Sequence, residues 1–217
     1  MKTTFLKITA LVAFVAFSSC KDKAEEAETK AAEEVAVAKS TAVTFKADTD
    51  KSIITWKGFK PTGSHEGTIN VKGGTIAING DTVESGKFTI DMSTIEVTDI
   101  PKSEEGNANL QGHLSGPDFF DVAGFPTAEF EVTGFENKDG KSMLSGNLTM
   151  KGETNNISFP VKTSVDGDTM TLTSETFTID RSKWNIKYGS KSFFDDLGDK
   201  FINDDIELTV TLLANKA

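Results

Sequence analysis

Few side chains in this sequence of 217 residues could carry acid–base, metal or anion chemistry. There are two histidines, His65 and His113, and a single arginine, Arg181. A guanidinium group can hold a phosphate or a carboxylate through two parallel hydrogen bonds, so Arg181 is a candidate for binding an anionic group. An ion pair with a nearby aspartate is the alternative. His113 is a second candidate for contact with a polar group, and its alternative is a structural contact that fixes a short helix to a sheet.

Metal binding and catalysis find little support. The possible metal ligands are His65, Glu66, His113 and Asp118, and no spacing in the sequence brings three or four of them together. The chain has no Gly-x-Ser-x-Gly motif and no recognisable nucleophile–base–acid set. We therefore expect no metal, no cofactor and no enzymatic activity. The alternative is a hydrolase or isomerase, in which His65 and His113 would lie close together.

Cys20, the only cysteine, ends a segment with the features of an export signal. Lys2 and Lys7 precede an apolar run over residues 8–17. The length of this run is about half of the roughly 20 residues needed to span a bilayer. The stretch Phe17-Ser18-Ser19-Cys20 resembles a bacterial lipobox, although Phe17 stands where the usual box has leucine. We expect residues 1–19 to be a lipoprotein signal peptide and Cys20 to carry the lipid. The alternative is a free cysteine after an ordinary signal.

Such a lipid would anchor the exported chain to the bacterial cell envelope. We expect the outer membrane, facing the periplasm, and leave exposure at the cell surface open. The net charge is −10, so nucleic acid, which needs a basic face, is not an expected partner. Residues 20–42 are rich in Ala, Glu and Lys. They predict a flexible acidic tether that is partly helical, supported by the i, i+4 pair Glu26 and Lys30.

From Val43 onward the apolar residues alternate, which predicts about ten half-buried strands. Turn signals such as Asn79-Gly80 and Asp139-Gly140 separate them. Short sequential strands favour an antiparallel sheet, and closing that sheet into a barrel or a sandwich removes its exposed edges. The fold class is therefore all-β and antiparallel, with one or two short helices, and the resemblance described below implies the β-barrel. Residues 107–114 can form a helix, and residues 192–201 are a second break in the pattern. Phe119 and Phe120 cannot both face inward on a strand, so we expect a turn with one ring plugging the barrel; the alternative is a mobile gate at the mouth of a pocket.

Three motifs resemble the YceI family. They are His113-Leu114-x-x-x-Asp118-Phe119-Phe120-Asp121-Val122 with Phe125-Pro126-Thr127-Ala128-x-Phe130, then Gly146-Asn147-Leu148-Thr149-Met150-Lys151-Gly152, and Asp180-Arg181-Ser182-x-Trp184-x-Ile186. The resemblance covers roughly residues 43–215, within the predicted YceI-like barrel domain, residues 43–217. It implies a lipocalin-like barrel that binds a long isoprenoid or similar amphiphile in its lumen. Members of the family are usually soluble and periplasmic, so the lipobox and tether are a departure.

The resemblance and the inward positions together imply a set of site residues. The candidates for lining the lumen are Trp56, Phe88, Ile90, Phe119, Phe130, Leu148, Phe159, Phe177 and Trp184. Arg181 and His113 are the candidates for contact with a lipid head group. The expected function is an envelope lipoprotein that binds or sequesters an isoprenoid-like lipid. The alternative is a tethered interaction or stress-response module with a filled core and no ligand. The oligomeric state is left open.

Overall fold

The alternating segments after Val43 form ten strands, as predicted, because period-two apolar residues present one face to a common core. The computed structural model describes residues 24–217. The ten strands are β3 (Val43–Ala47), β4 (Ile53–Lys60), β5 (Gly63–Asn79), β6 (Thr82–Val97), β7 (Thr127–Lys138), β8 (Lys141–Met150), β9 (Glu153–Asp166), β10 (Thr169–Ser174), β11 (Phe177–Asp180) and β12 (Asp205–Lys216).

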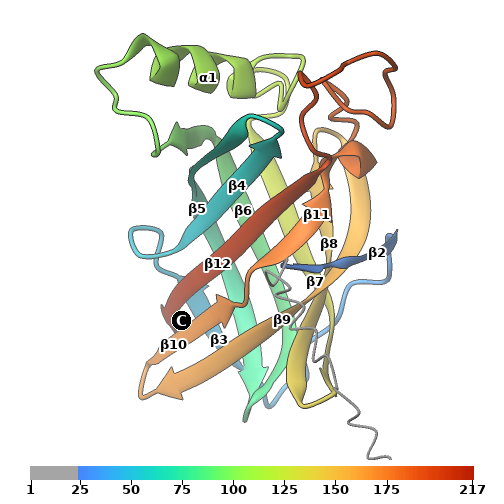
Figure 1. Cartoon of the computed structure of the whole chain (residues 1–217). Helices are drawn as coiled ribbons and strands as arrows, with labels where there is room; N and C mark the ends of the chain where they lie inside the picture. Colours follow the sequence, from blue (N-terminus) through green and yellow to red (C-terminus); the bar gives the residue numbers. More distant parts are fainter. Residues whose placement is uncertain (1–23) are drawn as a thin grey trace, which may run out of the picture.

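Backbone hydrogen bonds close these strands into a ring. Each strand from β4 to β9 pairs with the next one along the chain, and β12 pairs with β10 and β11 on one edge and with β3 and β4 on the other. All of these pairings are antiparallel. The predicted antiparallel barrel is therefore confirmed, and Figure 1 shows its strands inclined around a central axis. Closure satisfies strand edges that would otherwise be open to pairing with other chains.

Tight hairpins set the register of the neighbouring strands. Asp139 and Gly140 have φ values of 52° and 80°, and Lys151 and Gly152 have 48° and 80°. Positive φ at both central residues is the signature of the hairpin turn whose twist matches that of the strands. The turn predicted at Asp139-Gly140 is thus confirmed, and a turn of the same kind at Lys151-Gly152 joins β8 to β9.

One end of the barrel is covered by three segments, which we call the cap. They are helix α1 (Glu105–Ser115), the turn at residues 116–125 and the loop at residues 185–204 (Figure 1). A short 3₁₀ helix, η1 (Arg181–Trp184), joins β11 to that loop. The second predicted break, residues 192–201, contains turns. Among residues 24–217, no helix is both long enough and apolar enough to cross a bilayer.

The segment before β3 differs from the partly helical tether that its composition predicts. It forms β1 (Glu25–Glu26), which pairs parallel with β11, and β2 (Glu28–Ala31), which pairs antiparallel with β9. The pairing of β10 with β9 ends at Ser174. Beyond that point β9 and β11 are not paired with each other, so their facing backbone N–H and C=O groups need other hydrogen-bond partners. The N-terminal segment occupies that gap. Tertiary pairing therefore overrides the weak helix preference of an Ala- and Glu-rich sequence.

The chain then continues across the outside of the barrel toward β3. The backbone of Glu33 exchanges two hydrogen bonds with the side chain of Asn147, at 3.0 and 2.7 Å. The N–H of Ala36 donates to the carbonyl of Val132, and the N–H of Lys39 donates to Glu84 Oε2 at 2.7 Å. We call residues 25–39 the N-terminal strap, because they are tied to the barrel wall along their length.

Candidate functional site

The barrel interior holds two adjoining apolar cavities. The first, with a volume of about 100 Å³, lies under the cap, and the second, of about 90 Å³, lies in the middle of the barrel. They share four lining side chains, which are Ile54, Ile90, Leu148 and Leu208. An apolar cavity of about 150 Å³ in another protein stays dry and binds benzene, so spaces of this size matter for binding. The shared side chains lie where the two cavities adjoin, so the cavities follow one another along the inside of the barrel, and we call the two together the lumen.

Aromatic rings line the lower cavity in a packed row. Phe159 stacks on Phe177 with ring centroids 4.2 Å apart, and it lies 5.8 Å from Phe130. The ring of Phe130 lies directly against Gly146, where an added Cβ would fall 2.2 Å from Cζ. Any side chain at residue 146 would therefore displace that ring. This explains why a glycine stands in the middle of strand β8.

The structure brings eight of the nine predicted lumen residues to the cavities. Trp56 and Phe119 line the upper cavity, and Ile90 and Leu148 line both. The lower cavity is lined by Phe88, Phe130, Phe159 and Phe177. Trp184 is the exception, because it is fully buried on η1 and donates its indole N–H to the carbonyl of Leu148 at 2.9 Å. It holds the end of β8 and lines neither cavity.

The cap closes the upper cavity with more aromatic surface than the sequence indicated. Leu114, Phe119 and Phe120 all line it, so the expectation of a single plugging ring was wrong. The chain makes a turn here, which frees both rings from the alternation of a strand. Lys151 Nζ donates to the carbonyls of Pro117 and Phe119 at 3.1 and 2.6 Å, which fixes the turn. Burial lowers the pKa of Lys151, against the raising effect of Asp121 and Asp118.

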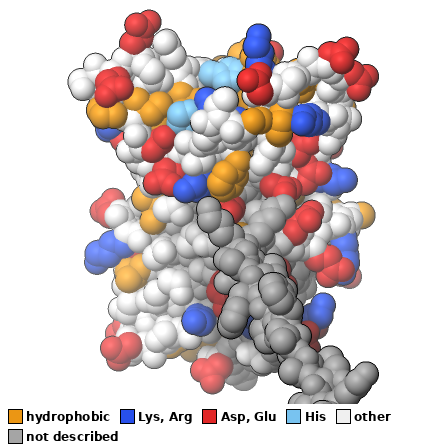
Figure 2. Space-filling view, viewed as in Figure 1, with side chains coloured by type: hydrophobic (Ala, Val, Ile, Leu, Met, Phe, Trp, Pro, Cys, Tyr) orange, Lys and Arg blue, Asp and Glu red, His pale blue; other side chains and the backbone are white. Residues whose placement is uncertain are grey.

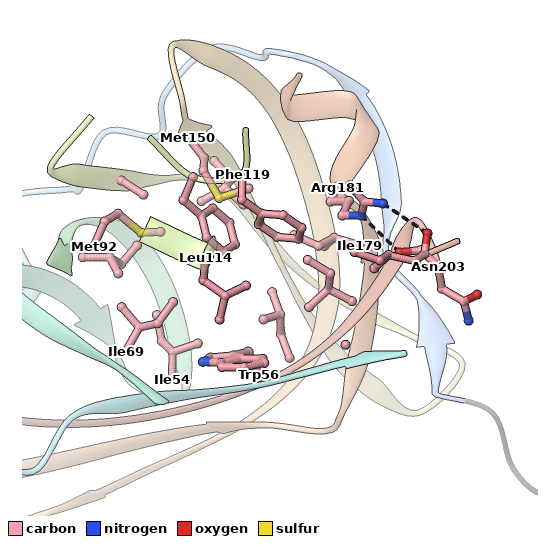
Figure 3. Close-up of a pocket in the computed structure, with 18 residues that line it drawn as sticks. Ile54, Trp56, Ile69, Met92, Leu114, Phe119, Met150, Ile179, Arg181 and Asn203 are labelled. Atoms are coloured by element: carbon pink, nitrogen blue, oxygen red, sulfur yellow. Dashed lines mark hydrogen bonds between the residues drawn. The ribbon is translucent and has the colours of Figure 1, made fainter. Parts of the chain in front are cut away.

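Figure 3 shows how the side chains face one another across the upper cavity. Met92, Met150, Leu114 and Phe119 approach from one side, and Ile54, Ile69 and Trp56 approach from the other. Only Arg181 and Asn203 among the lining residues have polar side chains. An apolar wall offers dispersion and desolvation but few directional partners, so it suits a featureless hydrocarbon chain.

Arg181 is wholly buried and its donors are used within the protein. Nε donates to the carbonyl of Asn203 at 3.1 Å, Nη1 to that of Ile186 at 2.7 Å and Nη2 to that of Ile202 at 3.1 Å. Nη2 also lies 3.3 Å from Asp204 Oδ1. Burial lowers the pKa of Arg181, and Asp204 opposes that effect. This geometry supports the interpretation of Arg181 as the partner of an ion pair. Its guanidinium group is not free to hold an anionic head group.

The two histidines have separate surroundings. His65 Nδ1 lies 2.8 Å from Asp99 Oδ2 at the start of β5. His113, on the last turn of α1, packs edge-on against Tyr188 and Phe119, with ring centroids 4.5 and 5.7 Å away. The enzyme alternative required the two imidazoles to converge, and these contacts do not bring them together. Among residues 24–217, no group of three or more His, Cys, Asp or Glu side chains could hold a metal ion.

Several residues that line the cavities were not among the candidates predicted from the sequence. Ile54 and Leu208 lie on the inward face of their strands, and their alternation with polar neighbours was a usable signal. Ile202 and Asn203 reach the upper cavity from a loop, where no periodicity exists to reveal them. Cys20 lies outside the described residues.

Comparisons with known proteins agree with this geometry. The model of the YceI-like domain family matches residues 34–214. BcnA from Burkholderia cenocepacia has a similar structure, with a TM-score of 0.60, 22% identity, and coverage of 78% of this chain and 99% of that one. A polyisoprenoid binding domain from Saccharophagus degradans, implicated in plant cell wall breakdown, is similar with a TM-score of 0.56, 12% identity, and coverage of 81% and 99%.

A mutant of the Campylobacter jejuni YceI protein is similar with a TM-score of 0.50, 19% identity, and coverage of 69% of this chain and 84% of that one. At these identities the structural likenesses establish the fold alone. No curated protein matches the chain. The family match extends from the N-terminal strap to the last strand and includes every lumen residue, so this chain belongs to the YceI-like domain family.

Proposed function

We propose that this domain binds a long apolar lipid, of isoprenoid type, inside the barrel lumen. One observation carries the proposal: two adjoining apolar cavities, which share Ile90 and Leu148 in their walls, follow one another inside the barrel and are lined by phenylalanines. Each CH₂ group that such a chain buries contributes about 0.8 kcal/mol. The likeness to a structure described as a polyisoprenoid binding domain supports the same ligand class.

The proposal concerns binding and sequestration, and catalysis has no part in it. The polar end of the lipid would lie at the cap, where His113 is only half-buried and remains the candidate for head-group contact. Arg181 would act indirectly, by holding the loop that closes the upper cavity. A filled core without ligand, the interaction-module alternative, is less well supported because the lumen retains space.

Trp56 offers a direct reporter of occupancy. It lines the upper cavity, whereas Trp184 does not, so a chain that enters the lumen should alter the emission of Trp56 alone. We would titrate the protein with a polyprenyl alcohol and follow tryptophan fluorescence. Trp56→Phe is the control and removes no hydrogen bond, since Trp56 Nε1 has no partner among the described residues. A saturable change that disappears in the control supports the proposal, and no change at any concentration would refute it.

We also propose that the chain is exported and anchored through a lipid on Cys20. The supporting observations are the export-type leader and the placement of the single cysteine at its end. Strand β1 begins at Glu25, so the covalent path from Cys20 to the barrel wall is at most about 18 Å at 3.6 Å per residue. The domain would therefore sit close to the membrane. Incorporation of labelled palmitate, lost in Cys20→Ser, would test the anchor.

A further inference from the structure

Three aromatic side chains are exposed on the cap, in the loop that follows η1. Tyr188, Phe193 and Phe194 are 47%, 48% and 49% exposed, and we call them the aromatic tip. The other large exposed apolar residues of the described chain are valines elsewhere, at residues 35, 37, 43 and 165. Figure 2 shows apolar side chains gathered across the upper end of the molecule, where the cap lies. Neighbouring exposed aromatic rings of this kind mark an interaction site.

A buried polar platform holds the tip in place. Ser190 is fully buried, and its Oγ donates to Asp204 Oδ2 at 2.9 Å, as does Ser192 Oγ at 2.6 Å. The backbone N–H groups of Phe193 and Phe194 both donate to the carbonyl of Ser190. Asp204 is in turn the ion-pair partner of Arg181. The backbone that carries the two rings is thus held in place, because the loop is anchored to Asp204, which is itself paired with the buried Arg181.

The tip is continuous with the lumen through the same loop. Ile202 and Asn203 line the upper cavity, and the N–H of Ile202 donates to the carbonyl of Gly189, next to Tyr188. A long apolar lipid has negligible solubility in water, so it must pass between the lumen and a membrane. The cap end, with its exposed rings, is the part of the described surface best suited to meet that membrane.

The charges around the tip indicate which lipid surface it fits. The loop between Asn185 and Phe201 carries three lysines and three aspartates, so it is neutral, whereas the whole chain carries −10. Lys187 lies over the ring of Phe193 at 4.8 Å, and Lys191 over the ring of Phe201 at 3.5 Å. Aromatic rings with long lysine stems are typical of segments that lie at a membrane interface. A neutral loop on an acidic protein favours binding to zwitterionic head groups over anionic ones.

We infer, building on the proposed lipid-binding function, that the aromatic tip docks on a zwitterionic bilayer and that the lipid enters and leaves the lumen there. Phe193 and Phe194 would insert among the head groups and upper acyl chains. The cap would then face the membrane, and the hairpin between β9 and β10, at the opposite end of the barrel, would face away (Figure 1).

A tryptophan placed at the tip would report insertion directly. We would reconstitute the full chain carrying Phe193→Trp in vesicles of phosphatidylethanolamine and phosphatidylcholine with brominated acyl chains, which quench nearby indoles. The matched control is Val165→Trp, because Val165 is 47% exposed on the hairpin at the far end of the barrel. The buried Trp56 and Trp184 give a common background. Quenching and a blue shift at residue 193, absent at residue 165, would support docking. Equal quenching at both, or none at either, would overturn it.

A transfer assay separates this inference from the proposed function. The double variant Phe193→Ser with Phe194→Ser should take a fluorescent prenyl lipid from donor vesicles about tenfold more slowly than wild type. Its binding of prenyl alcohol in solution should be unchanged, and Val165→Ser should match wild type in both assays. Unchanged transfer by the double variant would overturn docking while leaving lumen binding intact. A tip covered by a second copy would instead give a dimer that the double variant abolishes, which would also overturn it.

Discussion

The backbone N–H of Ala27 donates to the carbonyl of Thr178 over 2.8 Å, and the Ala27 side chain is buried in the core. This contact ties the N-terminal strap to β11 at the place where β9 has moved away. The neighbouring residues Phe177 and Ile157 both line the lower cavity. The strap therefore completes the wall around the site, although the family match begins only at residue 34.

Placing a charge at Ala27 should disrupt the contact between the N-terminal strap and β11. Ala27→Asp would bury a carboxylate in the core next to β11 and cost about 2 kcal/mol or more, since no cation is paired with it. Hydrogen exchange followed by mass spectrometry should show faster exchange in residues 153–160 and 177–180. Ala32→Asp is the control, because Ala32 is exposed on the same segment. Equal protection in the two variants would mean that the strap does not stabilise the wall.

Filling the junction of the cavities should block the ligand. Ile90→Phe adds a ring where the two cavities meet, opposite the small Ala128 on β7. We expect prenyl alcohol to bind at least about tenfold more weakly, with a stability loss of about 1–3 kcal/mol from overpacking. Thr89→Phe places the same ring on the outward face of β6 and should leave affinity unchanged. Full affinity in Ile90→Phe would place the ligand outside the lumen.

Removing the Arg181 guanidinium should destabilise the fold more than it affects binding. Arg181→Met would leave three backbone carbonyls and the Asp204 carboxylate without their partner, a cost of about 3–5 kcal/mol. Urea unfolding followed by Trp184 fluorescence would measure this loss. Lys183→Ala, which removes an exposed neighbouring cation, should cost less than about 0.5 kcal/mol. If Arg181→Met kept full stability but lost the lipid, the head-group role would be correct instead.

The hydrogen bond between Lys39, at the C-terminal end of the N-terminal strap, and Glu84 should make the stability of the fold depend on pH. Hydrogen bonds from the Lys39 backbone and then from Asn79 lower the pKa of Glu84 below its ordinary 4.5. Ionised Glu84 therefore stabilises the folded state above its unfolded pKa, and this contribution is lost as the pH falls through its folded pKa. The Tm difference between wild type and Glu84→Gln should be largest near neutral pH and vanish well below pH 4.5. A difference that does not change with pH would contradict this account; Glu34→Gln is the control.

The barrel and most of its lining could be predicted because side-chain direction in a strand depends only on alternation. Phe88 and Ile90 are two residues apart on β6, and Phe130 is opposite Phe88 on β7, so all three share the inward face. Trp184 could not be placed in the same way, since it lies on a 3₁₀ helix whose orientation is set by its bond to Leu148.

Long-range pairing explains the remaining differences. The N-terminal strap is extended because β9 and β11 present unsatisfied edges, a fact that no local propensity contains. The partners of Arg181 include residues 202–204, more than twenty positions away in a loop without periodicity. The sequence singled out the residue but could not identify what it contacts.

Native mass spectrometry of residues 24–217, purified from bacterial cells without detergent, tests the central claim most directly. The strap must be kept, because it completes the wall beside the lower cavity. We predict an added mass that extracts into organic solvent as a prenyl-type lipid and is reduced in Ile90→Phe but retained in Thr89→Phe. A protein that carries no added mass, and stays unliganded when a prenyl lipid is supplied, would contradict the claim that the lumen binds such a lipid.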